Sequence, residues 1–144
     1  MINIQLISIF LRINKKIMYK YFFIAGAPKS GTTKLAYDLS SHPEICVSNP
    51  KETNFFSRNS LKRLSSYYKE WVCQSESQYE KCFKKDAPYI WRCDGSVSYF
   101  DSTDAAIKIK EKHPNSKFIF ILRDPVERTL SHYSMDLRLG YVSK

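Results

Sequence analysis

The chain has 144 residues and a mass of 16.9 kDa, a length that suits one domain with a single hydrophobic core. Hydrophobic residues make up 43% of the sequence and charged residues 26%, which excludes a disordered or a fibrous protein. No run of 18 apolar residues occurs, which excludes an ordinary membrane-spanning helix.

The net charge is +9, from 23 Lys and Arg against 14 Asp and Glu. One interpretation is an anionic partner, such as a nucleic acid, a membrane surface, a nucleotide or a sulfated or phosphorylated substrate. The other is a general lysine bias, because the basic residues are dispersed along the chain. We expect no nucleic-acid partner, since aromatic residues such as Phe22, Phe23, Phe118 and Phe120 fall in expected core strands and cannot stack on bases.

The first part of the chain carries a strand pattern followed by a helix pattern. Residues 1–17 are expected to form an extension of a domain that spans residues 18–144, with Met18 as an alternative start. The continuous apolar run over residues 21–25 predicts a strand buried on both faces. A glycine-containing loop follows, and residues 32–40 are predicted to form a helix.

Two further helices are predicted in the middle of the chain. Apolar residues recur at helical spacing from Leu61 to Val72, with Asn59 or Ser60 as the N-cap. The second of these helices is predicted over residues 103–112, and we expect it to end near the His-Pro pair that follows.

The last part of the chain repeats the strand-to-helix pattern. Residues 117–122 predict a second buried strand. Asp124 as N-cap, Pro125 at the first helical position and Glu127 three residues after the cap predict the start of another helix. Its expected apolar face consists of Val126, Leu130, Tyr133 and Leu137.

Two strand–loop–helix units separated by helices predict an α/β fold with a central parallel sheet. In such sheets, ligands bind beyond the carboxyl ends of the strands. The junctions at residues 26–33 and 123–127 should therefore lie on the same edge of the sheet.

The four cysteines are Cys46, Cys73, Cys82 and Cys93. No CxxC pair occurs and no histidine stands at zinc-ligand spacing, so we expect no metal site. The even count permits disulfides without requiring them, and the redox compartment stays open.

The first junction reads Gly-Ala-Pro-Lys-Ser-Gly-Thr-Thr from Gly26 to Thr33. Its glycines have the spacing of a nucleotide P-loop, but Thr32 stands where the P-loop lysine would be, and Lys29 lies inside the loop. The backbone N–H groups and the helix start still favour an anion. The loop therefore predicts a site for one 5′-terminal nucleotide group rather than for a triphosphate with magnesium, with an ordinary turn as the alternative.

At the second junction, Arg123 ends the strand and Ser131 lies about two turns into the helix. A guanidinium with a nearby hydroxyl forms a good phosphate clamp. The alternative is that Arg123 pairs with an acidic neighbour while Ser131 faces water.

The Pro-Lys-Ser-Gly-Thr-Thr loop after a Phe-Phe-Ile strand, followed later by Arg-Asp-Pro-Val-Glu-Arg-x-x-Ser-His-Tyr, resembles the sulfotransferase family, in particular its carbohydrate (heparan sulfate-type) branch. The resemblance runs from about Tyr21 to Tyr141. It implies the N-terminal part of a three-layer, P-loop-like α/β domain that is truncated at its C-terminus. It also implies transfer of a sulfuryl group from 3′-phosphoadenosine 5′-phosphosulfate to a hydroxyl or amine acceptor, expected to be a carbohydrate, with no metal.

The resemblance also implies roles for single residues. The 5′-phosphosulfate would bind the loop residues Lys29, Ser30, Gly31, Thr32 and Thr33. The 3′-phosphate would bind Arg123 and Ser131, and Glu52 would be the catalytic base. Lys29 would also stabilise the charge on the leaving phosphate as a catalytic residue. Residues 95–100 resemble a segment near the acceptor, although Asp94-Gly95 stands where glycosaminoglycan-modifying members usually have Glu-Lys.

Several alternatives stay open from the sequence. The chain is also compatible with a non-catalytic nucleotide-binding fragment or pseudoenzyme, and with a P-loop kinase or NTPase, which the displaced lysine disfavours. We interpret His42, His113 and His132 as structural rather than as catalytic bases. Both a cytoplasmic location and the secretory pathway (Golgi) are open. Residues 1–13 are either a membrane-surface segment or a disordered extension, of which disorder is favoured.

Overall fold

The computed structural model describes residues 18–63, 72–85 and 88–143 of the chain, so the expected extension of residues 1–17 lies outside the described residues. The elements follow in the order β1 (Lys20–Gly26), α2 (Thr32–Ser40), β2 (Ile45–Val47), α3 (Arg58–Arg63), α4 (Glu76–Lys81), β3 (Trp91–Asp94), the 3₁₀ turn η1 (Val97–Tyr99), α5 (Thr103–Lys112), β4 (Lys117–Phe120) and α6 (Pro125–Leu139).

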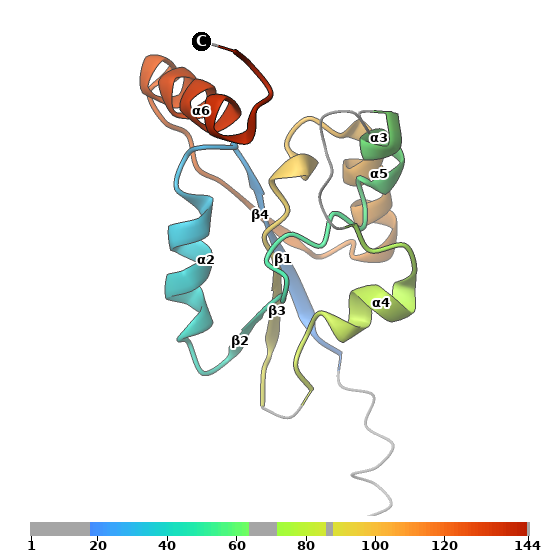
Figure 1. Ribbon diagram of the computed structural model, residues 1–144. Coiled ribbons are helices and arrows are strands. Elements are labelled where there is room, and N and C mark those ends of the chain that lie inside the picture. The colour runs from blue at the N-terminus through green and yellow to red at the C-terminus, as the bar shows by residue number, and fades with distance from the viewer. Residues whose placement is uncertain (1–17, 64–71, 86–87, 144) are drawn as a thin grey trace, which may run out of the picture.

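The strands form a four-stranded parallel sheet in the order β2-β3-β1-β4 (Figure 1). β1 lies between β3 and β4, so Phe22 pairs with Cys93 on one side and with Lys117 on the other. Parallel neighbours need crossover connections, which the helices supply. The predicted α/β fold with a central parallel sheet is confirmed.

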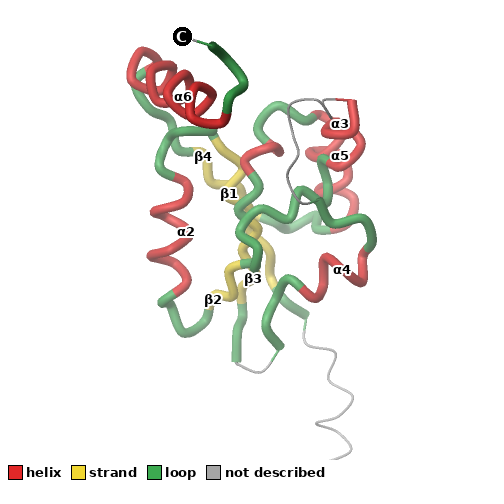
Figure 2. The backbone as a smooth tube through the Cα atoms, in the orientation of Figure 1, coloured by secondary structure: helices red, strands yellow, loops and turns green. Residues whose placement is uncertain are grey.

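The side chains of β1 alternate between two hydrophobic cores, as the two-residue repeat of a strand requires. Tyr21 and Phe23 belong to a core that includes Tyr79 of α4, whereas Phe22 and Ile24 pack in a second core near α2. Figures 1 and 2 show α2 on one side of the sheet and α3, α4 and α5 on the other. The described elements therefore form three layers.

Several sequence predictions match the structure, and one cap assignment is wrong. The predicted helices over residues 32–40 and 103–112 have the observed bounds of α2 and α5. α3 begins at Arg58, so Asn59 and Ser60 lie inside the helix and neither is its N-cap. The N–H of Leu61 donates to the carbonyl of Ser57, which precedes the first residue of α3. The rest of the predicted helix, residues 64–71, lies outside the described residues.

The strand predicted over residues 117–122 is present as β4, but its predicted burial is wrong. The strand is shorter, and β4 is the edge strand of the described sheet, with Phe120 53% and Leu122 74% exposed. The expected apolar face of α6 is exposed as well: Val126 and Leu130 face solvent, and no α6 residue is buried. The apolar face of α6 is present in the sequence, but no described element buries it.

Among the described residues, no helix has the combination of length and apolar composition that crossing a bilayer requires.

β1 ends at Gly26, whose backbone has a φ of +148°. An added Cβ at this position would lie 2.7 to 2.9 Å from side-chain atoms of Phe100. Gly140, which caps α6 with a φ of +73°, has open space around it. A side chain at Gly26 would therefore meet both an unfavourable φ and a steric clash, whereas a side chain at Gly140 would meet only a positive φ.

An unfavourable φ alone costs about 1–3 kcal/mol. We expect Gly26→Ala to lower the free energy of unfolding by more than this, because the added methyl group also displaces Phe100. Gly140→Ala is the matched control, with strain and no clash. Denaturant unfolding of both variants measures the difference, and equal losses would contradict the steric argument.

His113 is a partly buried titratable group that packs against the larger core. Its ring stacks on Tyr21 with centroids 3.8 Å apart, and its Nε2 is buried without a hydrogen-bond partner. Burial, with a smaller contribution from the neighbouring Lys112, lowers the pKa of His113 from 6.5 to about 4.

This shift predicts a loss of stability in acid. Between pH 6.5 and pH 4 the unfolded chain protonates His113 while the folded chain does not, so the free energy of unfolding falls as the pH falls. His113→Phe keeps an aromatic ring on Tyr21 and should flatten this dependence. Urea unfolding at several pH values tests it, and identical slopes in both proteins would refute the assignment to His113.

Candidate functional site

A cavity of about 390 Å³ lies at the carboxyl edge of the sheet, where β1 leads into α2 and β4 leads into α6. Its walls come from both junctions, from α6 and the residue Tyr141 after it, from η1 and from the loop at Glu52: Pro28, Lys29, Gly31, Thr32, Thr33, Glu52, Val97, Arg123, Ser131, His132, Met135, Leu139 and Tyr141. The expectation that the two junctions share one edge of the sheet is therefore confirmed.

The backbone of the first junction leaves N–H groups at the start of α2 without a side-chain cap. Lys29 and Gly31 have φ values of +65° and +94°, and Gly31 is the N-cap of α2 without a side-chain bond. The first N–H groups of a helix have no acceptor within it, so they are available to a ligand. Ser30 is 8% exposed and its hydroxyl has no hydrogen-bond partner, which fits a polar group that awaits one.

Direct contacts join the first junction to the second. The N–H of Ala27 and the carbonyl of Gly26 both bond to the backbone of Ile121, beyond the end of β4. Arg123 donates from Nη1 to the Lys29 carbonyl at 3.4 Å, and the ammonium of Lys29 lies 3.7 Å from the sulfur of Met135 on α6. The strand ends and these contacts set the width of the cavity.

The guanidinium of Arg123 takes part in two contacts at once. Its Nε pairs with Glu127 at 3.0 Å, as the alternative interpretation expected, yet Arg123 also lines the cavity with Ser131. Asp124 is the N-cap of α6, as predicted, and accepts from two backbone N–H groups.

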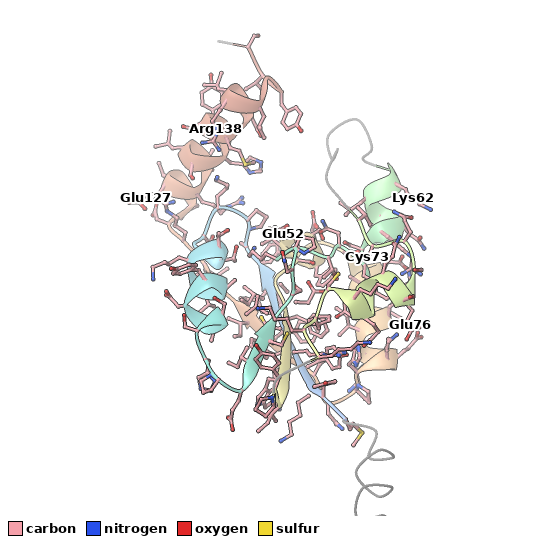
Figure 3. The ribbon with its side chains drawn as sticks, turned by 60° about the horizontal axis from the view of Figure 1, so that its bottom comes forward. Glu52, Lys62, Cys73, Glu76, Glu127 and Arg138 are labelled. Atoms are coloured by element: carbon pink, nitrogen blue, oxygen red, sulfur yellow. The ribbon has the colours of Figure 1, made fainter. Side chains whose placement is uncertain are left out.

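Glu52 lines the cavity wall opposite α6, and Figure 3 shows it near the middle of the molecule, whereas Glu127 and Arg138 lie on α6. Its Oε1 lies 3.0 Å from the ammonium of Lys51, which also donates to the hydroxyl of Thr32 at 3.3 Å. Sequence analysis did not select Lys51, because the residue that Lys51 contacts in the loop is 19 positions away.

A buried hydrogen-bond network fixes the segment that follows Glu52. The carboxylate of Asp94 is fully buried and accepts from Thr53, Tyr99 and both the hydroxyl and the backbone N–H of Ser96. Desolvation raises the pKa of Asp94 against the opposing effect of these donors. This network ties the Glu52 segment to the end of β3, and sequence analysis assigned no role to Asp94.

The three histidines lie in different surroundings. His42 accepts from the N–H of Glu44 in a turn, and His113 packs against the core, so neither lines the cavity. His132 does line it and lies 3.7 Å from Asp136, one turn along α6.

Within the described ranges, no three His, Cys, Asp or Glu side chains gather closely enough to hold a metal ion. The four cysteines are buried and free, with the sulfurs of Cys73 and Cys82 3.5 Å apart.

Comparison with known proteins identifies relatives of the chain, although no family model matches the sequence. Over 117 residues it is 30% identical to the membrane-associated sulfotransferase kil1 of Dictyostelium discoideum, a region that covers 81% of this chain and 23% of kil1. Over 118 residues it is 32% identical to the bifunctional heparan sulfate N-deacetylase/N-sulfotransferase 3 of Mus musculus, covering 78% of this chain and 12% of that protein.

A nematode relative extends the comparison. The bifunctional heparan sulfate N-deacetylase/N-sulfotransferase 1 of Caenorhabditis elegans is 29% identical over 116 residues, or 76% of this chain and 12% of that protein. The chain thus spans less than a quarter of the length of these curated relatives. Because the similarity covers most of this chain, the chain is homologous to the sulfotransferases, including those of the heparan sulfate type.

Proposed function

We propose that the protein binds 3′-phosphoadenosine 5′-phosphosulfate and transfers its sulfuryl group to a hydroxyl or amine of a carbohydrate. The observation that carries this proposal is the single cavity that both junctions and Glu52 line. The names of the mouse and nematode relatives, which act on heparan sulfate, support a carbohydrate acceptor. The name of kil1 supports a setting at a membrane, and we favour the secretory pathway over the cytoplasm.

The donor would bind across both junctions. Its 5′-phosphosulfate suits the loop from Lys29 to Thr33, where the helix start, the Lys29 ammonium and the unpartnered Ser30 hydroxyl all favour an anion. Its 3′-phosphate suits the Arg123 guanidinium and the Ser131 hydroxyl. One nucleotide with phosphates at both ends of its ribose explains why both groups face the same cavity.

In the proposed reaction, Glu52 accepts the proton of the acceptor hydroxyl or amine as the oxygen or nitrogen attacks sulfur. The bond between sulfur and the 5′-phosphate oxygen breaks, and adenosine 3′,5′-bisphosphate leaves. Negative charge builds up on that phosphate oxygen, which Lys29 and the loop N–H groups would stabilise. These side chains carry out each proposed step without a metal.

A second candidate is a non-catalytic module that binds the same nucleotide. One observation favours it: α6 supplies Ser131 but has no buried residue, so packing holds this wall of the cavity only weakly. Nucleotide binding without sulfuryl transfer would distinguish this module from the enzyme.

Calorimetry with adenosine 3′,5′-bisphosphate and transfer of labelled sulfate to carbohydrate acceptors test the proposal together. We expect Lys29→Met to weaken nucleotide binding about 10- to 100-fold, because a charge-assisted contact is lost. Glu52→Gln should keep binding within about threefold and slow transfer at least about 100-fold, because only the base is lost.

Lys62→Met is the control for the loss of a positive charge, since Lys62 is exposed on α3 and does not line the cavity (Figure 3). It should change neither measurement. Full transfer by both Lys29→Met and Glu52→Gln would show the assigned roles to be wrong. Absence of nucleotide binding by the folded wild-type protein would reject both candidate functions.

A further inference from the structure

We propose that Lys51 is a positioning residue of the donor site, which neutralises the carboxylate of Glu52 and ties it to Thr32, so that a base can stand beside a bound anion. The inference rests on the proposed function. It concerns a residue for which neither the motifs nor the resemblance gives a role.

The ammonium of Lys51 joins two segments that are distant in sequence. It lies 3.0 Å from Oε1 of Glu52 and 3.3 Å from the hydroxyl of Thr32, the first residue of α2. Glu52 and Thr32 both line the cavity, on the base side and the donor side respectively. One ammonium therefore connects the proposed base to the proposed anion loop.

The rest of Lys51 is fixed by its surroundings. Its carbonyl accepts from the N–H of Gly95 at 3.0 Å and from the hydroxyl of Ser48 at 2.7 Å. Its aliphatic stem lies against Gly95, where an added Cβ would come within 2.8 Å of the Lys51 Cγ. The side chain is 19% exposed, so this lysine is held in place rather than extended into solvent.

Electrostatics explains why such a cation is needed. The proposed base is an anion, and the proposed donor brings a phosphosulfate and a phosphate into the same cavity. Like charges that share a partly buried site repel each other, and the repulsion is stronger there than in bulk water. The ammonium of Lys51 cancels the charge of Glu52 and leaves Lys29 and Arg123 for the donor.

A double-substitution cycle isolates this effect. Lys51→Met, Glu52→Gln and the double variant are compared with the wild-type chain by calorimetry with adenosine 3′,5′-bisphosphate at low salt. We expect Lys51→Met to weaken binding about 10-fold, a typical coupling for contacting residues. The double variant should bind within about threefold of the wild-type chain, because the carboxylate that caused the repulsion has been removed and the pair is again neutral.

The pair Lys108 and Asp104 on α5 provides the matched control, with an ammonium-to-carboxylate distance of 2.6 Å. Lys108→Met, Asp104→Asn and their double variant carry the same charge changes away from the cavity and should leave nucleotide affinity unchanged. Lys51→Arg keeps the charge and should bind the nucleotide within about threefold of wild type. Thermal unfolding of each variant verifies that the fold is intact, and Lys51→Arg provides the test if Lys51→Met does not fold.

The outcomes separate the inference from the function on which it rests. A Lys51→Met loss that persists fully in the double variant would mean a packing role or direct ligand contact, and would overturn the inference. So would unchanged affinity in Lys51→Met, or a loss with Lys51→Arg as large as with Lys51→Met. If the folded wild-type chain does not bind the nucleotide, the proposed function fails and the inference fails with it.

Discussion

The structure depends on the parallel pairing of β1 with β3 on one side and β4 on the other. Phe23 and Ile24 are fully buried, one in each core, so the strand cannot slip by one residue without exchanging its two faces. Because parallel strands end at the same edge of a sheet, the segments that follow β1, β3 and β4 all start at the carboxyl edge. The loop that follows β1, the segment after Asp94 and the junction at Arg123 therefore converge there.

Burial of polar groups gives this edge its second constraint. The carboxylate of Asp94 is fully buried and accepts its hydrogen bonds from Thr53, Ser96 and Tyr99. Such a group is costly if any donor is lost, so the network specifies one arrangement of the segments it joins. Glu52 directly precedes Thr53, so the hydrogen bonds of Thr53 also fix the backbone position of Glu52. The place of the proposed base is thus a consequence of the core.

How much the sequence could predict depended on whether the signal was local. The apolar run of β1 and the glycines around Lys29 are local, and both were found. β3 was missed because its buried Arg92 and Asp94 break the apolar pattern, and the partner of Arg92 in the core is Glu80. The predicted burial of β4 is too high, because an apolar run indicates that a strand favours burial and does not indicate whether another element covers it. The role proposed for Lys51 could not be predicted, because its packing against Gly95 joins residues that are distant in sequence and is seen only in the folded chain.

The exposed wall gives the site a further property. α6 carries Ser131 and His132 and has no buried residue, and its contacts with the first junction run through Lys29, which approaches Met135 and accepts from Arg123. A ligand that binds both junctions adds free energy of binding to the arrangement in which α6 stands over the loop. Binding of the proposed donor would therefore stabilise the position of α6, and any free energy spent in holding α6 over the loop would lower the affinity for that donor.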